Sequence, residues 1–561
     1  MPDMLDPIAL ANAQLWLDSP LSPDDKATIL SWRESNPSLF NEAFYRDLEF
    51  GTGGLRGIMR LGSNGINKYT LGLATQGLAT YLKQEIDHRP SVAIAYDSRN
   101  NSQSFAQEVA RVLLANDVDV YLFDALRPTP QLSFAVRALN ASAGIVLTAS
   151  HNPKEYNGYK VYWNDGGQLV PPHDKALLTT VRATALTDIR WSGGSGKLHP
   201  LGADMDEQYW KALESLTFGS DGKKELRIVF TSLHGTSITL VPEAFKRSGF
   251  ASVSIVAEQA LPDGNFPTVV SPNPEEPAAL AMAIAQAESE GADLVIGCDP
   301  DTDRVGIAVR DNKGQLILLN GNETASVLMD YILHQRKIQG TLPKNAFVAR
   351  TIVTTPLLDA IASSYGVEMQ VCLTGFKWIA DLIRRQEGVK SYLFGGEESY
   401  GYLTGDFVRD KDAVSSSVLI AEAAAWNLAQ GRSFYGHLQE LYKRHGMYRE
   451  RLVSLTKEGR AGAEEIQATM DRYRQIPAKQ WAGIPVFSIS DYQSQSRTNS
   501  DGTVESLDLP ASNVVQWHMA NGDLITARPS GTEPKIKYYF CAVGDGGEER
   551  LEQYPKEILS L

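Results

Sequence analysis

Short runs rich in valine and isoleucine alternate with stretches of helical character along most of this chain. One round extends from "SVAIAYDS" at residues 91–98 to "AGIVLTAS" at residues 143–150. The pattern restarts at "KELRIVFTSLHG" and again with a helix after Gly321. Strands that alternate with helices in this way form βαβ units around a parallel sheet. The sequence therefore predicts three similar mixed α/β domains in series.

The C-terminal stretch has a different pattern. A polar helix at residues 461–474 precedes the two apolar segments of "VVQWHMANGDLITARPSG", which an Asn-Gly dipeptide separates. Asn-Gly between apolar runs is typical of a tight β-hairpin. We therefore expect a C-terminal antiparallel α+β domain. The expected domain limits are 1–205, 206–321, 322–450 and 451–561.

The composition is that of a large folded protein. The chain has 561 residues, of which 43% are hydrophobic, enough to bury a large core. Its three cysteines form no CxxC pair, so neither a disulfide framework nor a cysteine metal site is indicated. Acids stand where a signal peptide has Lys or Arg, and no apolar stretch approaches the ~20 residues that span a bilayer. These features predict a cytoplasmic protein with no membrane partner.

The net charge of −14 bears on the partners of the protein. An acidic surface repels polyanions, so we expect no nucleic-acid partner. A ligand that carries phosphate would have to be held by a local cluster of positive groups.

Four polar clusters each follow directly after an apolar run. At the carboxyl ends of strands in α/β sheets, loops present side chains and backbone N–H groups to ligands. We therefore expect the four clusters to meet in one cleft. They are "TASHNP" (148–153), "DPDTDR" (299–304), "GGEESYG" (395–401) and "ARPSGTEPK" (527–535).

Asp299, Asp301 and Asp303 alternate along the second cluster. An EF-hand would need glycine at position six and glutamate at position twelve, where this chain has Arg304 and Arg310. A solvated turn is the alternative, although the preceding apolar run counts against it. Three carboxylates held this close repel one another unless a cation neutralises them, and three protein oxygens leave coordination positions open. This behaviour fits Mg²⁺.

Ser150 lies in the first cluster. A hydrolase nucleophile elbow would have glycine two positions before and after the serine, where this chain has Thr148 and Asn152. Two interpretations remain: Ser150 caps the following turn, or it carries a phosphoryl group that a metal and basic side chains stabilise. Phosphoryl transfer needs mainly positioning and charge stabilisation, which such a loop provides.

The last cluster offers five groups that suit a phosphate dianion. A guanidinium, two hydroxyls, a backbone N–H and an ammonium converge if the segment forms a tight loop. A polar hairpin turn is the alternative interpretation. The five residues are Arg528, Ser530, Gly531, Thr532 and Lys535.

Two further motifs are weak when taken alone. In "GEES", Glu397 and Ser399 could bind vicinal sugar hydroxyls, but the pattern is also typical of a solvated turn. In "GTGGLRG", Arg56 stands among four glycines, which is typical of a flexible loop.

Together these motifs resemble the α-D-phosphohexomutases, the phosphoglucomutase/phosphomannomutase group. They occur in the family's order and are spread over nearly the whole chain. The extra N-terminal length, "TSLHGTS" and "SPNPEEP" are more similar to the phosphoglucomutase-2/phosphopentomutase branch than to the short bacterial phosphomannomutases. The matching motifs are "GTGGLRG", "TASHNP" with Lys160 downstream, "GCDPDTDR", "TGFKWI" at 374–379, "GEESYG" and "RPSGTEPK".

The resemblance implies four domains around one cleft, with the first three alike and the fourth mobile. It implies that Ser150 becomes the phosphoserine and that one of its oxygens binds Mg²⁺ together with Asp299, Asp301 and Asp303. Three side chains would flank the transferring phosphoryl group, namely Arg56, His151 and Lys160. Of these, Lys160 is favoured for proton movement, because a lysine beside Mg²⁺, arginine and another base can have its pKa lowered into a useful range.

The resemblance also assigns the substrate-binding residues. Arg304 and Lys377 would line the sugar. Sugar contacts would come from Thr374, Gly375, Glu397 and Ser399, and the phosphate that does not react would be held by Arg528, Ser530, Gly531, Thr532 and Lys535.

The implied reaction moves a phosphoryl group between the 1- and 6-positions of a hexose phosphate, with glucose 1-phosphate and glucose 6-phosphate as the favoured pair. It passes through a phosphoserine and a bisphosphate, so Mg²⁺ and glucose 1,6-bisphosphate are the expected cofactors. Small sugar phosphates are the expected partners, and the sequence predicts no oligomeric state. Mannose or pentose phosphates as substrates, and a glucose-1,6-bisphosphate synthase, remain the alternatives.

Overall fold

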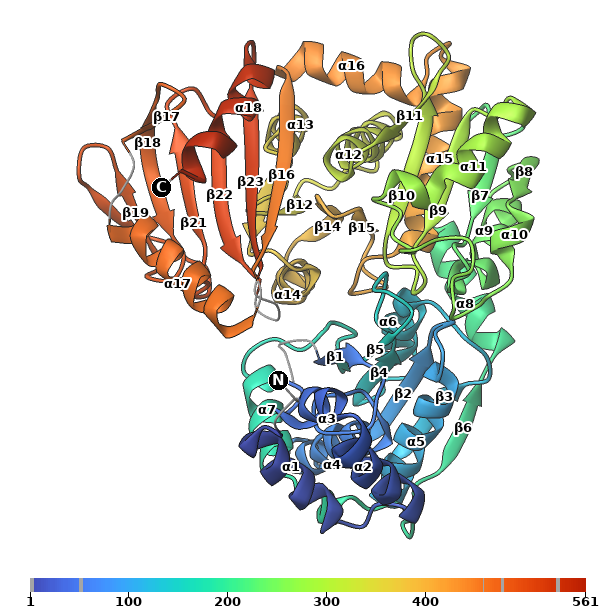
Figure 1. The fold of residues 1–561 in the computed structure, drawn as a ribbon. Coiled ribbons are helices and arrows are strands. Elements are labelled where there is room, and N and C mark those ends of the chain that lie inside the picture. The colour runs from blue at the N-terminus through green and yellow to red at the C-terminus, as the bar shows by residue number, and fades with distance from the viewer. Residues whose placement is uncertain (1–4, 50–53, 458, 476–478, 531–534, 561) are drawn as a thin grey trace.

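The structure is a computed structural model, and four β-sheets follow one another along its chain (Figure 1). We call the parts that contain them domains I to IV. The structure describes residues 5–49, 54–457, 459–475, 479–530 and 535–560.

Three short helices precede the first sheet. Each begins with a proline that follows a side-chain cap, from Asp6, Ser22 and Asn36 respectively, which satisfies N–H groups of the first turn. Their apolar faces pack on Tyr69 and neighbouring side chains of domain I. The helices are α1 (Pro7–Leu17), α2 (Pro23–Ser35) and α3 (Pro37–Phe44).

Domain I is a six-stranded sheet in the order β1-β5-β4-β2-β3-β6, with helices on both faces. Alternate residues of β2 face opposite layers: Val92 and Ile94 pack under α4 and α5, whereas Ala93 and Ala95 pack under α6. Its strands are β1 (Gly54–Ile58), β2 (Ser91–Tyr96), β3 (Asp119–Phe123), β4 (Ala143–Leu147), β5 (Tyr156–Trp163) and β6 (Leu198–Leu201). Its helices are α4 (Lys68–Glu85), α5 (Ser102–Ala115), α6 (Thr129–Ala138), α7 (His173–Arg182) and η1 (Leu186–Asp188).

Domain II has a five-stranded sheet in the order β11-β10-β9-β7-β8. Its strands are β7 (Arg227–Thr231), β8 (Ser252–Ile255), β9 (Leu294–Cys298), β10 (Val305–Arg310) and β11 (Leu316–Leu319). Its helices are α8 (Ala203–Glu214), η2 (Thr236–Thr239), α9 (Val241–Arg247), α10 (Ala257–Ala260) and α11 (Pro277–Glu290).

Domain III has a four-stranded sheet in the order β13-β12-β14-β15. Its strands are β12 (Ala346–Thr351), β13 (Glu368–Cys372), β14 (Ser391–Glu397) and β15 (Gly401–Thr404). Its helices are α12 (Gly321–Ile338), α13 (Leu357–Tyr365), α14 (Phe376–Gln386), α15 (Ala413–Ala429) and α16 (Phe434–His445).

Domain IV is antiparallel throughout its main path, β16-β23-β22-β21-β18-β19-β20, as the Asn-Gly turn between β21 and β22 predicts. Its strands are β16 (Tyr448–Thr456), β17 (Gln480–Trp481), β18 (Ile484–Asp491), β19 (Ser496–Asn499), β20 (Val504–Ser506), β21 (Val515–Met519), β22 (Leu524–Pro529) and β23 (Lys535–Val543). Its helices are α17 (Gly459–Gln475) and α18 (Gly547–Ile558).

The predicted fold class is confirmed, but the prediction of parallel sheets is only partly correct. In domains I to III, the strand after each polar cluster turns back antiparallel to the strand before it: β5 on β4, β10 on β9 and β15 on β14. The fourth cluster likewise joins β22 to antiparallel β23. The first three clusters are therefore hairpin loops, which ladder hydrogen bonds fix at both ends, and the fourth cluster begins on β22 and ends on β23. Closing pairs such as Cys298–Val305 and Glu397–Gly401 leave short loops between the strands.

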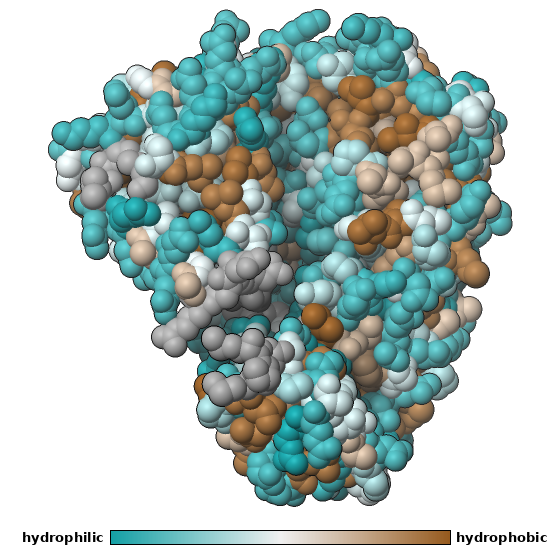
Figure 2. All heavy atoms as spheres, viewed as in Figure 1, coloured by the Kyte–Doolittle hydropathy of each residue, from teal (hydrophilic) through white to brown (hydrophobic). Residues whose placement is uncertain are grey.

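The hydrophobic core is continuous through domains I to III, whereas domain IV has a core of its own around Trp517 and Phe540. A small cluster of Ile352, Leu373, Tyr492 and Val514 joins domain III to domain IV. Figure 2 shows this face of the molecule hollowed between domain IV and the rest of the chain. The expected mobility of domain IV stays a prediction.

The predicted domain limits stay predictions as well. Residues 205 and 206 fall inside α8, residue 321 begins α12, and residue 450 falls inside β16. Across the described residues, the helices lack the combined length and apolar character that crossing a membrane requires.

Candidate active site

The loop between β4 and β5 presents Ser150 to domain II. Ser150 is 3% exposed, and its backbone is left-handed, with φ at +50°. Its Oγ donates a hydrogen bond of 2.6 Å to Oδ2 of Asp299 and lies 3.1 Å from Nδ1 of His151. A non-glycine residue at positive φ is uncommon and persists where its surroundings hold it in place. Ser150 is thus held against the aspartate loop.

The loop between β9 and β10 is built around Asp299. Its Oδ1 accepts hydrogen bonds from the N–H groups of Asp303 at 3.1 Å and Arg304 at 3.0 Å. Burial, together with the charges of Asp301 and Asp303, raises the pKa of Asp299 well above its usual range. The three carboxylates therefore lie in the repulsive arrangement for which a cation is the natural counter-charge.

The "TSLHGTS" motif packs against this aspartate loop. The N–H and Oγ1 of Thr236 donate to the carbonyl oxygen of Pro300 at 2.8 and 2.9 Å, and Thr236 Oγ1 lies 2.8 Å from Thr302 Oγ1. Gly235 lies so close that an added Cβ would stand 2.5 Å from Cα of Pro300. The motif therefore fixes the position of the loop that carries the aspartates.

The aspartate cluster fits a hard divalent cation such as Mg²⁺. One oxygen from each of Asp299, Asp301 and Asp303 lies within 4.8 Å of the others. Oδ1 of Asp301 and Oδ1 of Asp303 are buried and accept no hydrogen bond from the residues that the structure describes. Buried carboxylate oxygens without donors need an explanation, and coordination by a metal provides one.

Two lysines contact the same carboxylates. Lys160 Nζ on β5 lies 2.7 Å from Asp301 Oδ2 and 3.2 Å from Asp303 Oδ2. Burial lowers the pKa of Lys160, but Asp301 and Asp303 outweigh burial and raise it. The predicted lowering of this pKa beside Mg²⁺ stays a prediction, because without a cation the neighbours that dominate are the two acids.

Lys411 is the second lysine, and sequence reasoning missed it. Its Nζ lies 3.2 Å from Asp303 Oδ2 and 3.0 Å from Asp410 Oδ1. Despite burial, Asp303 and Asp410 raise its pKa above the ordinary value. The only local signal is a lysine between two acids in "RDKDA", which does not reveal a partner in another domain.

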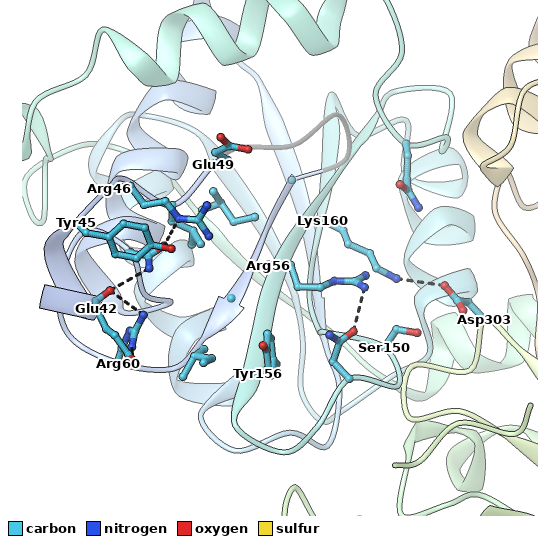
Figure 3. A pocket seen from close by; sticks show the side chains of 18 of the residues that line it. Glu42, Tyr45, Arg46, Glu49, Arg56, Arg60, Ser150, Tyr156, Lys160 and Asp303 are labelled. Atoms are coloured by element: carbon cyan, nitrogen blue, oxygen red, sulfur yellow. Dashed lines mark hydrogen bonds and ion pairs between the residues drawn. The ribbon is translucent and has the colours of Figure 1, made fainter. Parts of the chain in front are cut away.

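Ser150, Asp303 and the two lysines line a cavity of about 930 Å³. Figure 3 shows Arg56, Lys160 and Ser150 pointing toward one another and toward Asp303. Arg56 Nη1 donates to Asn152 Oδ1 at 3.1 Å, which ties β1 to the serine loop. Of the residues predicted for the site, the cavity lining includes Arg56, Ser150, Lys160, Asp303 and Arg304.

His151 and Arg304 complete the surroundings of Ser150. Burial, with the positive charges of Arg304 and Arg56, lowers the pKa of His151 well below its usual range. Arg304 Nη1 donates to Glu275, and this ion pair connects the "SPNPEEP" segment to the site. Sequence reasoning assigned no role to Glu275.

The predicted sugar-contacting residues form a second group in domain III. Glu397 Oε1 accepts a hydrogen bond of 2.8 Å from the N–H of Gly375. The buried hydroxyl of Thr374 has no hydrogen-bond partner within the described part of the chain. Lys377 Nζ lies 4.0 Å from Asp174 Oδ2, and burial lowers the pKa of Lys377. Ser399 lies in the loop that follows Glu397. Among the described residues, this group is not part of the 930 Å³ cavity lining.

Electrostatics connects the two groups. Glu397 contributes to the raised pKa of Arg304, and Lys411 acts to lower the pKa of Glu397, which burial nevertheless raises. The two groups are thus within electrostatic reach of each other.

The hairpin of domain IV carries the predicted phosphate-binding residues. Arg528 on β22 stands opposite Lys537 on β23, and the Ser530 N–H donates to the Lys535 carbonyl at 2.7 Å. Gly531 and Thr532 lie outside the described residues, as do the first two glycines of "GTGGLRG". Lys537 was not predicted, because it lies beyond the motif and only cross-strand pairing brings it beside Arg528.

The domain IV hairpin faces the "GEES" loop. Arg528 and Lys537 act to lower the pKa of Glu398, which burial and Glu397 raise to about 7. Burial lowers the pKa of Lys537. The positive groups of domain IV and the carboxylates of domain III are thus within electrostatic reach of each other.

Comparisons with known proteins agree with this arrangement. Three family models match in order along the chain, each described as a phosphoglucomutase/phosphomannomutase α/β/α domain. Domain I of the model matches residues 47–188, domain II matches 207–314 and domain III matches 320–445.

Curated relatives match almost the whole length. The phosphoglucomutase of Staphylococcus haemolyticus is 37% identical over 542 residues, which cover 94% of this chain and 96% of the relative. The phosphoglucomutase of Staphylococcus epidermidis is 39% identical over 508 residues, which cover 89% of this chain and 91% of the relative.

Solved structures share the fold. A phosphoglucomutase/phosphomannomutase family protein from Burkholderia thailandensis has a TM-score of 0.67 at 20% identity, covering 91% of this chain and 96% of that one. The open form of the phosphoglucomutase pp63/parafusin from Paramecium has a TM-score of 0.67 at 18% identity, covering 92% and 94%. This chain therefore belongs to the α-D-phosphohexomutase family and is a phosphosugar mutase, an isomerase that acts on sugar phosphates.

Proposed function

We propose that this mutase interconverts glucose 1-phosphate and glucose 6-phosphate through a phosphoserine at Ser150. The observation that carries the proposal is the 2.6 Å hydrogen bond from Ser150 Oγ to Asp299, at the edge of a buried carboxylate cluster. The curated relatives at 37–39% identity are named phosphoglucomutases, which supports glucose as the sugar.

The first half-reaction transfers the phosphoryl group to the sugar. The free hydroxyl oxygen of a sugar monophosphate attacks the phosphorus on Ser150, the new O–P bond forms, and the P–Oγ bond breaks. The hydroxyl proton ends on Ser150 Oγ, and we assign its relay to Lys160 and His151. The product is glucose 1,6-bisphosphate, which we propose as the intermediate and activator.

The second half-reaction restores the phosphoserine. The bisphosphate turns around, Ser150 Oγ attacks the phosphorus of the other phosphate, and the sugar oxygen leaves with the proton. In both orientations the phosphate that does not react is held by Arg528, Ser530 and Lys535, together with Gly531 and Thr532. One phosphate site then serves both isomers.

The remaining residues hold charge and orientation. Asp299, Asp301, Asp303 and a phosphoserine oxygen would hold Mg²⁺, which when bound neutralises charge on the phosphoryl group. Arg56 faces the same group from β1. Arg304 and Lys377 line the sugar, and its hydroxyl-binding groups are Thr374, Gly375, Glu397 and Ser399. The cytoplasmic location also remains our proposal.

A substrate panel tests the function. Turnover is measured on glucose 1-phosphate, mannose 1-phosphate and ribose 1-phosphate, for the native chain, for Ser150→Ala and for the exposed control Ser104→Ala. We expect fastest turnover on glucose 1-phosphate and its loss only in Ser150→Ala. Faster turnover on mannose or ribose 1-phosphate would reassign the sugar. Net accumulation of bisphosphate on addition of 1,3-bisphosphoglycerate would instead indicate a bisphosphate synthase.

A further inference from the structure

The buried side chain of Arg99 bonds the loop that carries Ser150. Arg99 follows β2, and its side chain is 0% exposed. Its Nη2 donates to the carbonyl oxygen of Ser150 at 2.6 Å and to that of Asn152, while Nη1 donates to the carbonyl oxygens of Pro153 at 2.8 Å and Tyr156 at 3.1 Å. Four carbonyl groups of one loop therefore converge on one guanidinium.

The orientation of this guanidinium is fixed from behind. Asp97 Oδ1 accepts the N–H of Arg99 at 2.9 Å, and Asp97 Oδ2 lies 3.5 Å from Arg99 Nε. Ser102 Oγ donates to Asp97 at 2.7 Å and accepts from Asn157 Nδ2 at 2.9 Å. A buried charge is stable only with such a partner, so Arg99 and Asp97 form one unit.

Domain II packs against the other side of Arg99. The ring of Phe266, itself 2% exposed, has its centroid 5.1 Å from Arg99 Cζ, a cation–π contact. Asn100 Nδ2 donates to Asn265 Oδ1 at 3.0 Å. At Gly264 an added Cβ would stand 2.3 Å from the Asn100 nitrogen, so the two backbones touch. Arg99 is thus held between the serine loop and the domain that carries Asp299.

The serine loop needs external support of this kind. Ser150 has a left-handed backbone, and two backbone hydrogen bonds within the loop run from the Asn152 N–H to the Ala149 carbonyl and from the Tyr156 N–H to the Pro153 carbonyl. A change of the Ser150 backbone torsions away from this left-handed conformation would break its carbonyl bond to Arg99 and displace Oγ from Asp299. Positioning within a fraction of an ångström is what phosphoryl transfer requires of the protein.

We propose that Arg99 is a positioning residue for phosphoryl transfer: it locks the Ser150 loop in the conformation that places Oγ on Asp299, and Phe266 ties this lock to domain II. Arg99 itself donates to backbone carbonyls and is not assigned a contact with substrate. The inference rests on the proposed phosphoserine role of Ser150. It adds that the alignment of serine and metal site is set by a contact between domains I and II.

Arg99→Lys is the central test, because lysine keeps the charge opposite Asp97 but cannot bond four carbonyls. We expect kcat to fall by roughly 10²-fold, while KM for glucose 1-phosphate stays within about twofold, because the phosphate site in domain IV is untouched. A loosened loop also exposes the phosphoserine to water, so the phosphoenzyme should lose inorganic phosphate faster. Amide hydrogen exchange should accelerate in peptides from residues 148–158.

Arg127→Lys is the matched control. Arg127 is also buried and ion-paired, with two bonds of 2.9 Å to Asp206, but it does not contact the serine loop. The Arg127→Lys substitution should lower the free energy of unfolding. It should leave kcat, KM and the amide exchange of residues 148–158 at their native values. Equal kcat in the two variants, or native exchange of the loop in Arg99→Lys, would overturn the proposal.

Phe266→Leu covers the case in which Arg99→Lys does not fold. It keeps the guanidinium and all its bonds, so we expect a smaller loss of kcat in the same direction and faster exchange of the same peptides. Native kcat and native amide exchange in this variant would overturn the proposal that Phe266 couples Arg99 to domain II. Ser150→Ala separates the two hypotheses, because full turnover there would refute the phosphoserine, while loop exchange still decides the role of Arg99.

Discussion

Lys411 Nζ lies 3.2 Å from Asp303 Oδ2, so domain III places a buried ammonium on the carboxylate cluster of domain II. Lys411→Met removes this positive charge, so Asp410 loses its ammonium partner while Asp303 keeps Lys160. Because an uncompensated buried charge is costly, we expect a loss of roughly 3 kcal/mol in unfolding free energy. Mg²⁺ supplies replacement charge at Asp303, so it should raise the Tm of this variant more than that of the native chain.

Thermal unfolding with Mg²⁺ and with EDTA measures both effects. Lys390→Met is the control, since Lys390 pairs with Glu368 on the surface, where an ion pair contributes little. If Mg²⁺ shifts Tm equally in all three proteins, the cation does not bind beside Lys411.

Arg528 and Lys537 stand opposite each other on the domain IV hairpin. If they hold the phosphate that does not react, Arg528→Ala should weaken binding of glucose 1-phosphate and glucose 6-phosphate alike. We expect a rise in Kd of about tenfold, which corresponds to ~1.4 kcal/mol. Calorimetric titration on a Ser150→Ala background prevents turnover during the measurement.

Arg497→Ala serves as the control, because Arg497 lies on β19 of the same domain and donates to Ser490. Its Kd for both isomers should remain native. A loss confined to one isomer in Arg528→Ala would show that the two orientations do not share this site.

Local motifs identify the loops, because Ser150 and the three aspartates each lie in a short segment of characteristic sequence. The sequence does not show the direction of the strand that follows, since β5 and β10 are buried on both faces. They therefore lack the alternation of polar and apolar residues that would separate parallel from antiparallel pairing. The mixed sheets therefore differ from the parallel ones that the sequence predicted.

Residues that act through distant partners leave no motif. Arg99, Glu275 and Lys411 contact the site from segments far along the chain, and each appears in the sequence as an ordinary charged residue. The sign of the Lys160 pKa shift also depends on such partners. Its spacing from Ser150 does not show that Asp301 and Asp303 are its nearest charges.

The buried carboxyl group of Glu450 should make the stability of the protein depend on pH. Burial, with a contribution from Glu323, raises the pKa of Glu450 to about 7 from its ordinary value of 4.5. The native state then binds more protons than the unfolded state between these two values, so stability falls as pH rises from about 4.5 to about 7. Glu450→Gln should flatten this decline.

Denaturant unfolding at pH 5, 6, 7 and 8 measures the slope, with the exposed Glu552→Gln as the control. The native chain and the control should lose stability in parallel over this window. A Glu450→Gln curve with the native slope would show that other groups cause the decline.

Gly235 sets the position of the aspartate loop. An added Cβ would stand 2.5 Å from Cα of Pro300, a backbone atom that cannot move alone, so Gly235→Ala must displace the loop that carries Asp299 and Asp301. We expect Mg²⁺ affinity to fall about tenfold or more, because a hard cation requires its oxygens at fixed distances. Gly547→Ala is the matched control, since its nearest atom lies 3.4 Å away in ordinary contact. Mg²⁺ titration followed by calorimetry compares the two variants. Native Mg²⁺ affinity in Gly235→Ala would mean that the "TSLHGTS" motif does not determine the geometry of the metal site.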